Sequence, residues 1–244
     1  GVIGCMAERL KEELLENGKG VDIVAGPDTY RDLPKLCREA ESGGKGINTL
    51  LSTEETYADI APVRLDKNGV SGFISIMRGC NNFCAYCVVP YTRGRERSRS
   101  HETIVNEART LFENGYREVT LLGQNVNSYG KGLAKKTTFA DLIRELNSID
   151  GLERIRYMTS HPKDFTDDII DAIAESPKVC RHFHLPFQAG SDRILKAMNR
   201  HYQRDYYLDL MEKIRTRFPD SVLTTDIIVG FPGETEEDFQ DTID

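Results

Sequence analysis

The sequence lacks the features of membrane and secreted proteins. No apolar run approaches the ~20 residues that a helix needs to span a bilayer. The first residues, GVIGC, include no initiator Met and no basic or apolar segment of a signal peptide. We therefore expect neither a membrane protein nor a secretory signal in this sequence. Because the sequence also starts and stops abruptly, we expect a fragment of a longer protein.

The sequence also lacks an excess of basic charge and has few cysteines. Its 39 acidic residues outnumber 32 basic ones, giving a net charge of −7, which argues against a protein that coats nucleic acid by bulk charge. A local basic patch is still compatible with this balance. Six cysteines are too few and too unevenly spaced for a small disulfide scaffold. Three of them fall within eight residues, which indicates a metal site in a reducing compartment and hence a cytoplasmic protein.

From residue 70 onward, short β-rich runs alternate with amphipathic segments at helical spacing. The predicted strands are 73–77, 119–122, 155–158, 182–185 and 222–229. The predicted helical segments are 104–112, 139–149, 165–173 and 206–214. This alternation predicts a parallel α/β architecture. A closed eight-fold barrel takes ~250 residues, so we expect a partial (βα) barrel. A helix start at Thr235 lies close to the last residue, so a truncated final helix is expected.

The first part of the sequence follows a different pattern. We predict a helix over 6–17, a strand over 21–24 and a second helix over 29–42. These elements are typical of the remainder of a small α/β unit. The predicted organisation is therefore an N-terminal domain over 1–50, a linker over 51–69 and a partial barrel over 70–244.

The cysteine cluster gives the strongest chemical signal. Cys80, Cys84 and Cys87 are spaced C-x3-C-x2-C directly after the first predicted barrel strand, where parallel α/β folds bind ligands. A structural zinc site needs four ligands, and the nearest downstream candidate for the fourth is His101. A cubane iron–sulfur cluster held by three thiolates instead keeps one iron open for a substrate. From the spacing alone, both readings stay open.

At these residues the sequence resembles the radical S-adenosylmethionine (SAM) enzymes, and the likeness extends over essentially the whole chain. Within them it resembles the methylthiotransferases, most closely the branch that modifies tRNA. The matching segments are CAYCVVPYTRGRERSR (84–99), LLGQNVNSYG (121–130), TSHP (159–162), HLPFQAGS (184–191) and TTDIIVGFPGETEEDF (224–239). The first two strings are the most specific of the five.

The resemblance implies two 4Fe–4S clusters in the full-length protein. One is held by Cys80, Cys84 and Cys87, and its open iron chelates SAM, whose reductive cleavage yields a 5′-deoxyadenosyl radical. The other is an auxiliary cluster, and Cys5 matches the last of its three ligands. Its other two ligands would precede residue 1, so we expect that this chain does not hold the auxiliary cluster stably. Cys37 and Cys180 match no motif and are expected to be structural.

The resemblance also implies residues that contact SAM, all of which follow predicted strands. The expected contacts are Gln124 and Asn125 for the methionine part, Gln188 and Ser191 for the ribose, and Gly230 and Gly233 for the adenine. Amides can read the edges of a bound group, and glycine permits a close approach of the backbone. We expect His161 to be structural, and the roles of His182 and His184 stay open.

A run of arginines stands out on this acidic chain, at Arg93, Arg95, Arg97 and Arg99. One interpretation is a solvated loop with ion pairs, which is the usual fate of a charge run. The other is a patch that grips nucleic-acid phosphates, because arginine binds phosphate bidentately and stacks on bases. Tyr86 and Tyr91 nearby could supply stacking surfaces, although packing is the commoner fate of single aromatic residues.

The function implied by the resemblance is transfer of a methylthio group to C2 of N6-isopentenyladenosine next to the tRNA anticodon. One SAM would supply the methyl group and a second the radical. The implied partners are the tRNA anticodon loop, SAM and an electron donor such as flavodoxin, and we expect a cytoplasmic monomer. Two alternatives are a methylthiotransferase acting on a ribosomal-protein aspartate, against which the string at 87–94 argues, and a zinc-stapled RNA-binding module without redox chemistry.

Overall fold

The computed structural model describes residues 1–16, 20–60, 62 and 69–244. Contacts divide the chain into two compact units. The first contains residues 1–55, 78–83 and 87–97, and the second contains residues 56–77, 84–86 and 98–244. The end predicted for the first helix, at residues 17 and 18, and much of the predicted linker lie outside the described residues. The domain boundaries expected at residues 50 and 70 stay a prediction.

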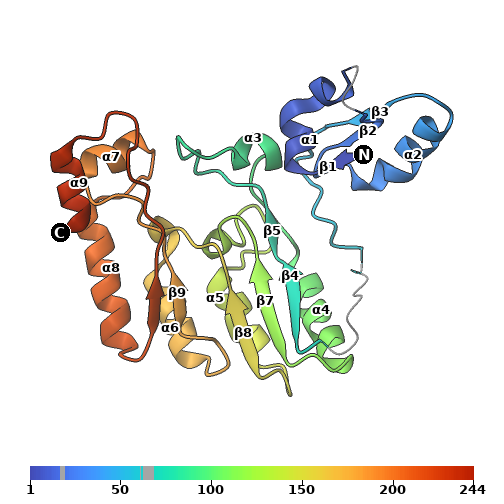
Figure 1. Cartoon of the computed structure of the whole chain (residues 1–244). Helices are drawn as coiled ribbons and strands as arrows, with labels where there is room; N and C mark the ends of the chain where they lie inside the picture. Colours follow the sequence, from blue (N-terminus) through green and yellow to red (C-terminus); the bar gives the residue numbers. More distant parts are fainter. Residues whose placement is uncertain (17–19, 61, 63–68) are drawn as a thin grey trace. The chain divides into compact units, whose positions relative to one another are not determined.

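The second unit is built on parallel strands. β4 (Ser71–Ser75), β7 (Glu118–Leu122) and β8 (Arg154–Tyr157) form one parallel sheet, in which Ile74 pairs with Leu121 and Leu121 with Tyr157. β9 (His182–His184) and β10 (Val222–Thr224) form a second parallel pair. Figure 1 shows the five strands side by side. A strand is present within or overlapping each of the five predicted runs, the last of them only in part, and no closed barrel is found among the described residues.

The last strand is shorter than the sequence predicts. The prediction ran over residues 222–229, but β10 ends at Thr224, and beyond it only Ile227 makes an isolated bridge, to Gln188. The run is apolar enough for a strand, but Ile227 and Val229 are about half exposed or more because no further strand pairs with them in the described part of the chain. Pairing, and not hydrophobicity alone, defines a strand.

Four helices pack on the strands of the second unit (Figure 1). They are α4 (His101–Glu113), α5 (Phe139–Asn147), α6 (Asp167–Glu175) and α8 (Arg204–Arg217). Thr138 and Asp141 form a capping box that begins α5, because each side chain accepts the other residue's backbone N–H. Most residues of the predicted helical segments' apolar faces lie in one core. Phe112 of α4, which is half-buried, and Tyr206 of α8, which is 42% exposed, lie outside it.

Two short helices were not predicted, α3 (Val89–Arg93) and α7 (Asp192–Ala197). They are too short to show a helical period in the sequence. The predicted helix start at Thr235 is confirmed, since Thr235 and Asp238 form the capping box of α9 (Glu236–Ile243).

Burial alternates along β4, β8 and β9. In β4, Ile74 is fully buried on the helix side, whereas its neighbour Phe73 is 57% exposed on the other face. In β9, Phe183 is buried between His182 and His184, which lie on the less buried face. The hydrophobic core of the second unit therefore lies between the sheet and its helices. The opposite face is accessible at Phe73 of β4, whereas Thr120, its partner in the central strand β7, is buried on that face.

The first unit contains a three-stranded parallel sheet in the order β1 (Val2–Ile3), β2 (Ile23–Ala25) and β3 (Gly46–Asn48). Its helices are α1 (Cys5–Leu10) and α2 (Leu33–Glu41), with 3₁₀ turns at Lys11–Leu15 and Tyr30–Asp32. The predicted helix from residue 6 is thus an α-helix for only part of its length. β5 (Met77–Arg78) and β6 (Arg97–Ser98) form a separate two-stranded sheet.

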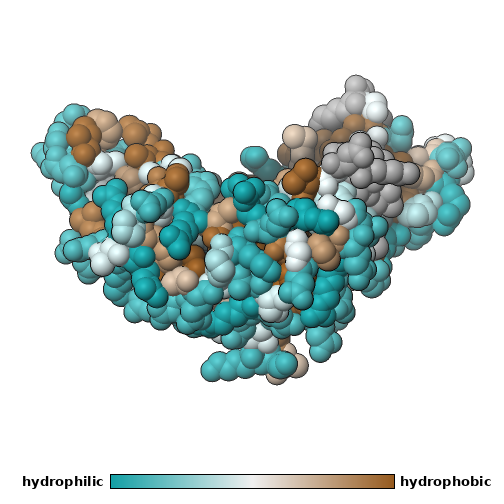
Figure 2. Space-filling model, turned by 90° about the horizontal axis from the view of Figure 1, so that it is seen from below, coloured by the Kyte–Doolittle hydropathy of each residue, from teal (hydrophilic) through white to brown (hydrophobic). Residues whose placement is uncertain are grey.

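The surface seen from below Figure 1 is mainly hydrophilic, with scattered hydrophobic patches (Figure 2). Among the helices of the described residues, none combines the length and the apolar character needed to cross a membrane.

The one-sided core predicts different costs for neighbouring residues of β4. Ile74→Ala is expected to lower the free energy of unfolding by about 2–4 kcal/mol, because it leaves a cavity in a packed core. Phe73→Ala, on the accessible face, is expected to cost less than about 1 kcal/mol although it removes a larger side chain. Urea unfolding of both variants tests this, and equal costs would contradict the assignment of the two faces.

Candidate functional site

The cysteine loop follows the first strand of the sheet, as predicted. Cys80, Cys84 and Cys87 are all free thiols; the first two are each 8% exposed, and the third is half-buried. In the first unit, the amide of Cys80 donates to the carbonyl of Gly94 at 3.2 Å. Gly79 just before it has a φ of +72°, and a Cβ there would collide with the Arg95 carbonyl, so this position requires glycine.

In the second unit, Cys84 lies against the segment that follows α7. The amide of Ala85 donates to the carbonyl of Met198 at 3.0 Å. The guanidinium of Arg200 lies 3.5 Å from Cys84 Sγ. Arg200 carries no sequence signal of this contact, because 116 residues separate it from Cys84.

The donor set fits an iron–sulfur cluster better than a zinc ion. A structural zinc ion needs four ligands, and His101, the nearest candidate for the fourth, has Nε2 2.5 Å from Glu145 Oε2. Within the described ranges, no group of three or more His, Cys, Asp or Glu side chains is arranged to hold a single metal ion. Three free thiols within eight residues are the number of protein ligands that leaves one iron of a cubane cluster open.

Gln124 and Asn125 lie at the carboxyl end of β7, in the turn before the 3₁₀ helix Val126–Ser128. Asn125 is 1% exposed, and its Nδ2 donates to Asp164 Oδ2 at 2.7 Å. Burial raises the pKa of Asp164, but the hydrogen bond from Asn125 and the charges of Lys163 and Lys131 outweigh it, so that the pKa is lowered. The amide oxygens Gln124 Oε1 and Asn125 Oδ1 are buried without a partner. Unpaired buried acceptors are costly, so they fit a site that a ligand with N–H donors completes.

The other four expected SAM contacts lie after β9 and β10. Gln188 is buried, with a φ of +73°, and exchanges backbone hydrogen bonds with residues 226 and 228. Ser191 Oγ donates to Asp238 Oδ1 at 2.5 Å, so it already has an internal partner. Gly230 and Gly233 have φ of +77° and +85°, and a Cβ on either would meet open space. The turn conformation explains both glycines, and room is left beside each backbone. None of the six expected contacts is tested by this structure, and each stays a prediction.

Strained backbone collects near the carboxyl ends of the strands. Phe83 in the cysteine loop, Thr159 after β8 and Gln188 after β9 all have φ between +50° and +73°. For a β-branched residue such as Thr159 this region is a genuine outlier. Such strain persists where the surrounding structure holds it, most often at functional sites.

The arginine run divides into buried and accessible members. Arg97 is 6% exposed; its Nη2 donates to both carboxylate oxygens of Asp28 at 2.8 Å, and its other nitrogens donate to three backbone carbonyls. Arg99 is also buried and pairs with Glu107 at 2.5 Å. A phosphate would have to displace these internal partners.

Arg93 and Arg95 are more accessible. Arg95 is exposed and lies over the Phe83 ring, 4.7 Å from its centroid. Arg93 is half-buried, with Nε 2.9 Å from Cys5 Sγ at the start of α1. The described residues thus leave Arg95 best placed to meet a phosphate, and nucleic-acid binding by the run stays a prediction.

The histidines have different environments. His182 and His184 share Thr224 Oγ1, at 3.1 and 3.0 Å, on the less buried face of β9. His161 is 5% exposed, and its Nδ1 accepts from the amide of Lys163 at 3.3 Å, which supports the structural role expected of it. Its Nε2 is buried without a partner.

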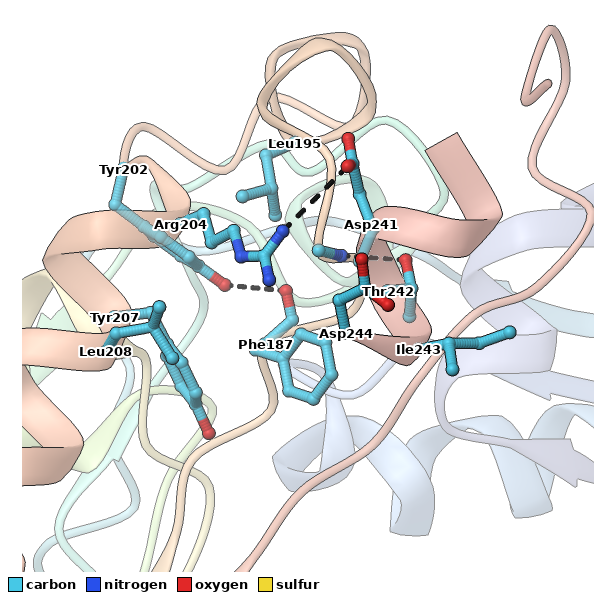
Figure 3. Close-up of a pocket in the computed structure, with 12 residues that line it drawn as sticks. Phe187, Leu195, Tyr202, Arg204, Tyr207, Leu208, Asp241, Thr242, Ile243 and Asp244 are labelled. Carbon is cyan, nitrogen blue, oxygen red and sulfur yellow. Dashed lines mark hydrogen bonds and ion pairs between the residues drawn. The ribbon is translucent and has the colours of Figure 1, made fainter. Parts of the chain in front are cut away.

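A pocket of about 210 Å³ lies between the loop after β9, the start of α8 and the end of α9 (Figure 3). At its wall, Tyr202 Oη donates to the carbonyl of Phe187 at 2.8 Å, and the Arg204 guanidinium lies 3.9 Å from Asp241. None of the six expected SAM contacts is among the residues that line it. The pocket therefore lies beside the predicted SAM contacts and not at them.

The burial of His161 predicts a pH dependence of stability. Burial lowers the pKa of His161 from 6.5 to about 3, and the charge of Arg200 acts in the same direction. In the unfolded chain His161 takes up a proton near pH 6.5, whereas in the folded chain it stays neutral until about pH 3. The free energy of unfolding therefore falls as the pH drops below about 6.5. Between about pH 7 and about pH 5.5, the parent is expected to lose about 1 kcal/mol more than His161→Asn, which does not titrate. Chemical denaturation at both pH values measures the difference, and equal losses would show that His161 is protonated in the folded state.

Comparison with known proteins identifies relatives over the whole chain. The chain is 56% identical to a tRNA-2-methylthio-N(6)-dimethylallyladenosine synthase of Amoebophilus asiaticus, over 100% of this chain and 53% of the relative. It is 56% identical to the enzyme of the same name from Bacteroides thetaiotaomicron, over 98% of this chain and 53% of the relative. The enzyme of the same name from Christiangramia forsetii is 52% identical, over 100% of this chain and 54% of the relative. The chain spans about half the length of these relatives.

Solved structures share the fold. The radical SAM methyltransferase TsrM from Kitasatospora setae, with tryptophan substrate and a SAM analogue bound, superposes with a TM-score of 0.58 over 72% of this chain and 34% of that one, at 19% identity. The cobalamin-dependent SAM radical enzyme OxsB superposes with a TM-score of 0.59 over 90% of this chain and 35% of that one, at 13% identity.

The profile of the radical SAM superfamily matches residues 74–244, which include the cysteine loop and every strand of the second unit except the first residues of β4. The chain belongs to the radical SAM superfamily.

Proposed function

We propose that this chain is part of an enzyme that transfers a methylthio group to C2 of N6-isopentenyladenosine next to the anticodon of tRNA. The observation that carries the proposal is the identity of 52–56%, over 98–100% of the chain, to relatives named for this product. Three free thiols on the loop after the first strand supply the ligands that superfamily membership requires. None of these observations favours the two alternatives, which are a methylthiotransferase acting on a ribosomal protein and a zinc-stapled RNA-binding module.

Cys80, Cys84 and Cys87 would hold the 4Fe–4S cluster. When bound, the cluster supplies one electron and an iron without a protein ligand, which SAM can occupy. Two of the three cysteines are buried, which shields bound sulfur from water. Cys5 would be one ligand of the second cluster in the full-length protein, and the nearby Arg93 guanidinium would favour its thiolate.

The residues after β7, β9 and β10 would bind SAM. The buried side-chain oxygens of Gln124 and Asn125 lack hydrogen-bond donors, and the amino group of SAM has N–H donors that could bind to them. Gln188 and Ser191 lie in the loop after β9, and the backbone at Gly230 and Gly233 borders open space that a flat ring can fill. Holding SAM by groups from several strands fixes the carbon that must reach the target atom.

Arg93 and Arg95 would contact tRNA phosphates, and a base in an anticodon loop can leave its stack at modest cost. Tyr91, 67% exposed, and Tyr86, 39% exposed, offer aromatic rings for stacking. A tRNA substrate and reduced thiols together favour a location in the cytoplasm. The proposed electron donor is a protein such as flavodoxin, and the proposed oligomeric state is a monomer that a tRNA can approach.

The cysteine loop can be tested with a matched pair of variants. After anaerobic reconstitution, the parent chain is expected to contain about four irons per cluster and to form 5′-deoxyadenosine from SAM under reducing conditions. Cys84→Ala is expected to lose the broad absorption near ~400 nm and this product, since it removes a cluster ligand. Cys180→Ala is the control, because Cys180 is half-buried and burial raises the pKa of its thiol, so it is expected to be inert.

Loss of colour in both variants, or in neither, would contradict the assignment of the loop. The substrate is tested separately, by comparing 5′-deoxyadenosine formation with isopentenylated tRNA and with ribosomal protein. Stimulation by the ribosomal protein alone would replace the proposed substrate.

The phosphate contact is tested by Arg95→Met, which keeps an apolar side chain over Phe83 and removes the charge. This variant is expected to bind tRNA more weakly and to lower the slope of log K against log salt by about one. Arg109→Met, at an exposed position of α4, is the matched control and is expected to bind like the parent. A salt slope that is the same in all three chains would show that Arg95 does not meet a phosphate.

A further inference from the structure

Arg200 is a buried cation beside a cysteine of the proposed cluster. It is 4% exposed, and it lies between Asn199 and His201, which both have a φ of +59°. The turn after α7 therefore has left-handed backbone on both sides of Arg200. Its guanidinium reaches the second cysteine of the loop, at 3.5 Å from Cys84 Sγ.

The other partners of Arg200 are uncharged. They are Tyr202 Oη at 3.3 Å from Nε, Tyr86 Oη at 3.2 Å from Nη1 and the carbonyl of Pro186 at 2.7 Å from Nη2. A tyrosine hydroxyl is neutral at ordinary pH, because its usual pKa is about 10. Among the described residues, no carboxylate forms an ion pair with Arg200.

Among the described residues, those that act most strongly on the charge of Arg200 include no carboxylate. The ring of His161 is neutral, because burial and the charge of Arg200 itself lower its pKa. Arg97 provides a contrast within the same chain, since this equally buried guanidinium pairs with both oxygens of Asp28. A buried charge without an opposite charge is expensive. The thiol of Cys84 is the one neighbour of Arg200 that becomes an anion on binding metal, because metal ligation requires the thiolate.

We propose that Arg200 is a positioning residue that supplies the counter-charge to the Cys84 thiolate in the cluster-bound chain, donates an N–H···S hydrogen bond to it, and thereby favours the reduced cluster. The inference rests on the proposed cluster site and is independent of the tRNA substrate. Adding one electron makes the assembly of core and thiolates more negative, so a nearby fixed cation stabilises the reduced state more than the oxidised state. Arg200 thus makes the cluster easier to reduce, which means that its midpoint potential is higher with Arg200 than without it.

The competing explanation is that Arg200 only ties the cysteine loop to the turn after α7. The bond from Ala85 to Met198 joins the same two segments, and Arg200 would add to it through Tyr86 and Pro186. A structural tie contributes equally with and without the cluster. A counter-charge contributes only when the thiolate is present, so the two roles differ in how they couple to cluster binding.

The experiment compares the parent with Arg200→Met, Arg200→Lys and the exposed control Arg109→Met. Each chain is studied after anaerobic reconstitution and again after the cluster has been removed by chelation. Iron and sulfide content are measured first. The midpoint potential of the one-electron reduction is then measured by a redox titration monitored by electron paramagnetic resonance, and thermal unfolding is followed in both states.

We expect Arg200→Met to shift the potential to more negative values, Arg200→Lys to retain most of the parent potential, and Arg109→Met to match the parent. We also expect Arg200→Met to lower the unfolding temperature more in the cluster-bound chain than in the cluster-free chain, where removing an unpaired buried charge offsets lost hydrogen bonds. The proposal would be overturned if Arg200→Met had the same midpoint potential as the parent. It would also be overturned if the variant lowered the unfolding temperature equally in the cluster-bound and the cluster-free chain.

Failure to fold is also decisive. If cluster-free Arg200→Met does not fold while the cluster-free parent does, the residue is a structural tie and the proposal is wrong. If the reconstituted parent itself holds no iron and sulfide, the proposed cluster site fails and this inference falls with it. A parent with a cluster whose potential is insensitive to Arg200 overturns the inference alone.

Discussion

The chemistry of this chain depends on a one-sided core. In the second unit, helices cover one face of the parallel strands, and residues such as Ile74 and Phe183 are fully buried there. The opposite face has no such helix core and is accessible at Phe73 of β4, and the loops after the strands are free to carry polar groups without disturbing the packing. Because parallel strands all point the same way, those loops gather at one edge of the sheet, which is where α/β folds bind ligands.

The loops at this edge carry costs that the core must outweigh. Gln124 and Asn125 bury amide oxygens without donors, and Thr159 and Gln188 hold backbone conformations that favour glycine. Each feature would destabilise an isolated loop. Their concentration after successive strands, together with a cysteine loop at the end of the first strand, is what a binding site completed by its ligand would show.

Charge is distributed in the same uneven way. Arg97 and Arg200 are both almost fully buried. Arg97 is neutralised by Asp28, whereas the partners of Arg200 in the described part of the chain are neutral groups, one of them a thiol. The first arrangement holds the fold together without any ligand. The second is complete only when the thiol is ionised, so folding and cluster binding would be coupled through the same guanidinium.

Hydrophobic period and turn chemistry in the sequence determined the parallel strands, the main helices and the helix start at Thr235, and the spacing of three cysteines determined the expected metal site. These are local signals, readable over a few residues. The end of β10 and the separate fates of Arg97 and Arg200 were decided by tertiary structure. A strand needs a neighbour to pair with, and two arginines that look alike in sequence differ only in what the folded chain places beside them.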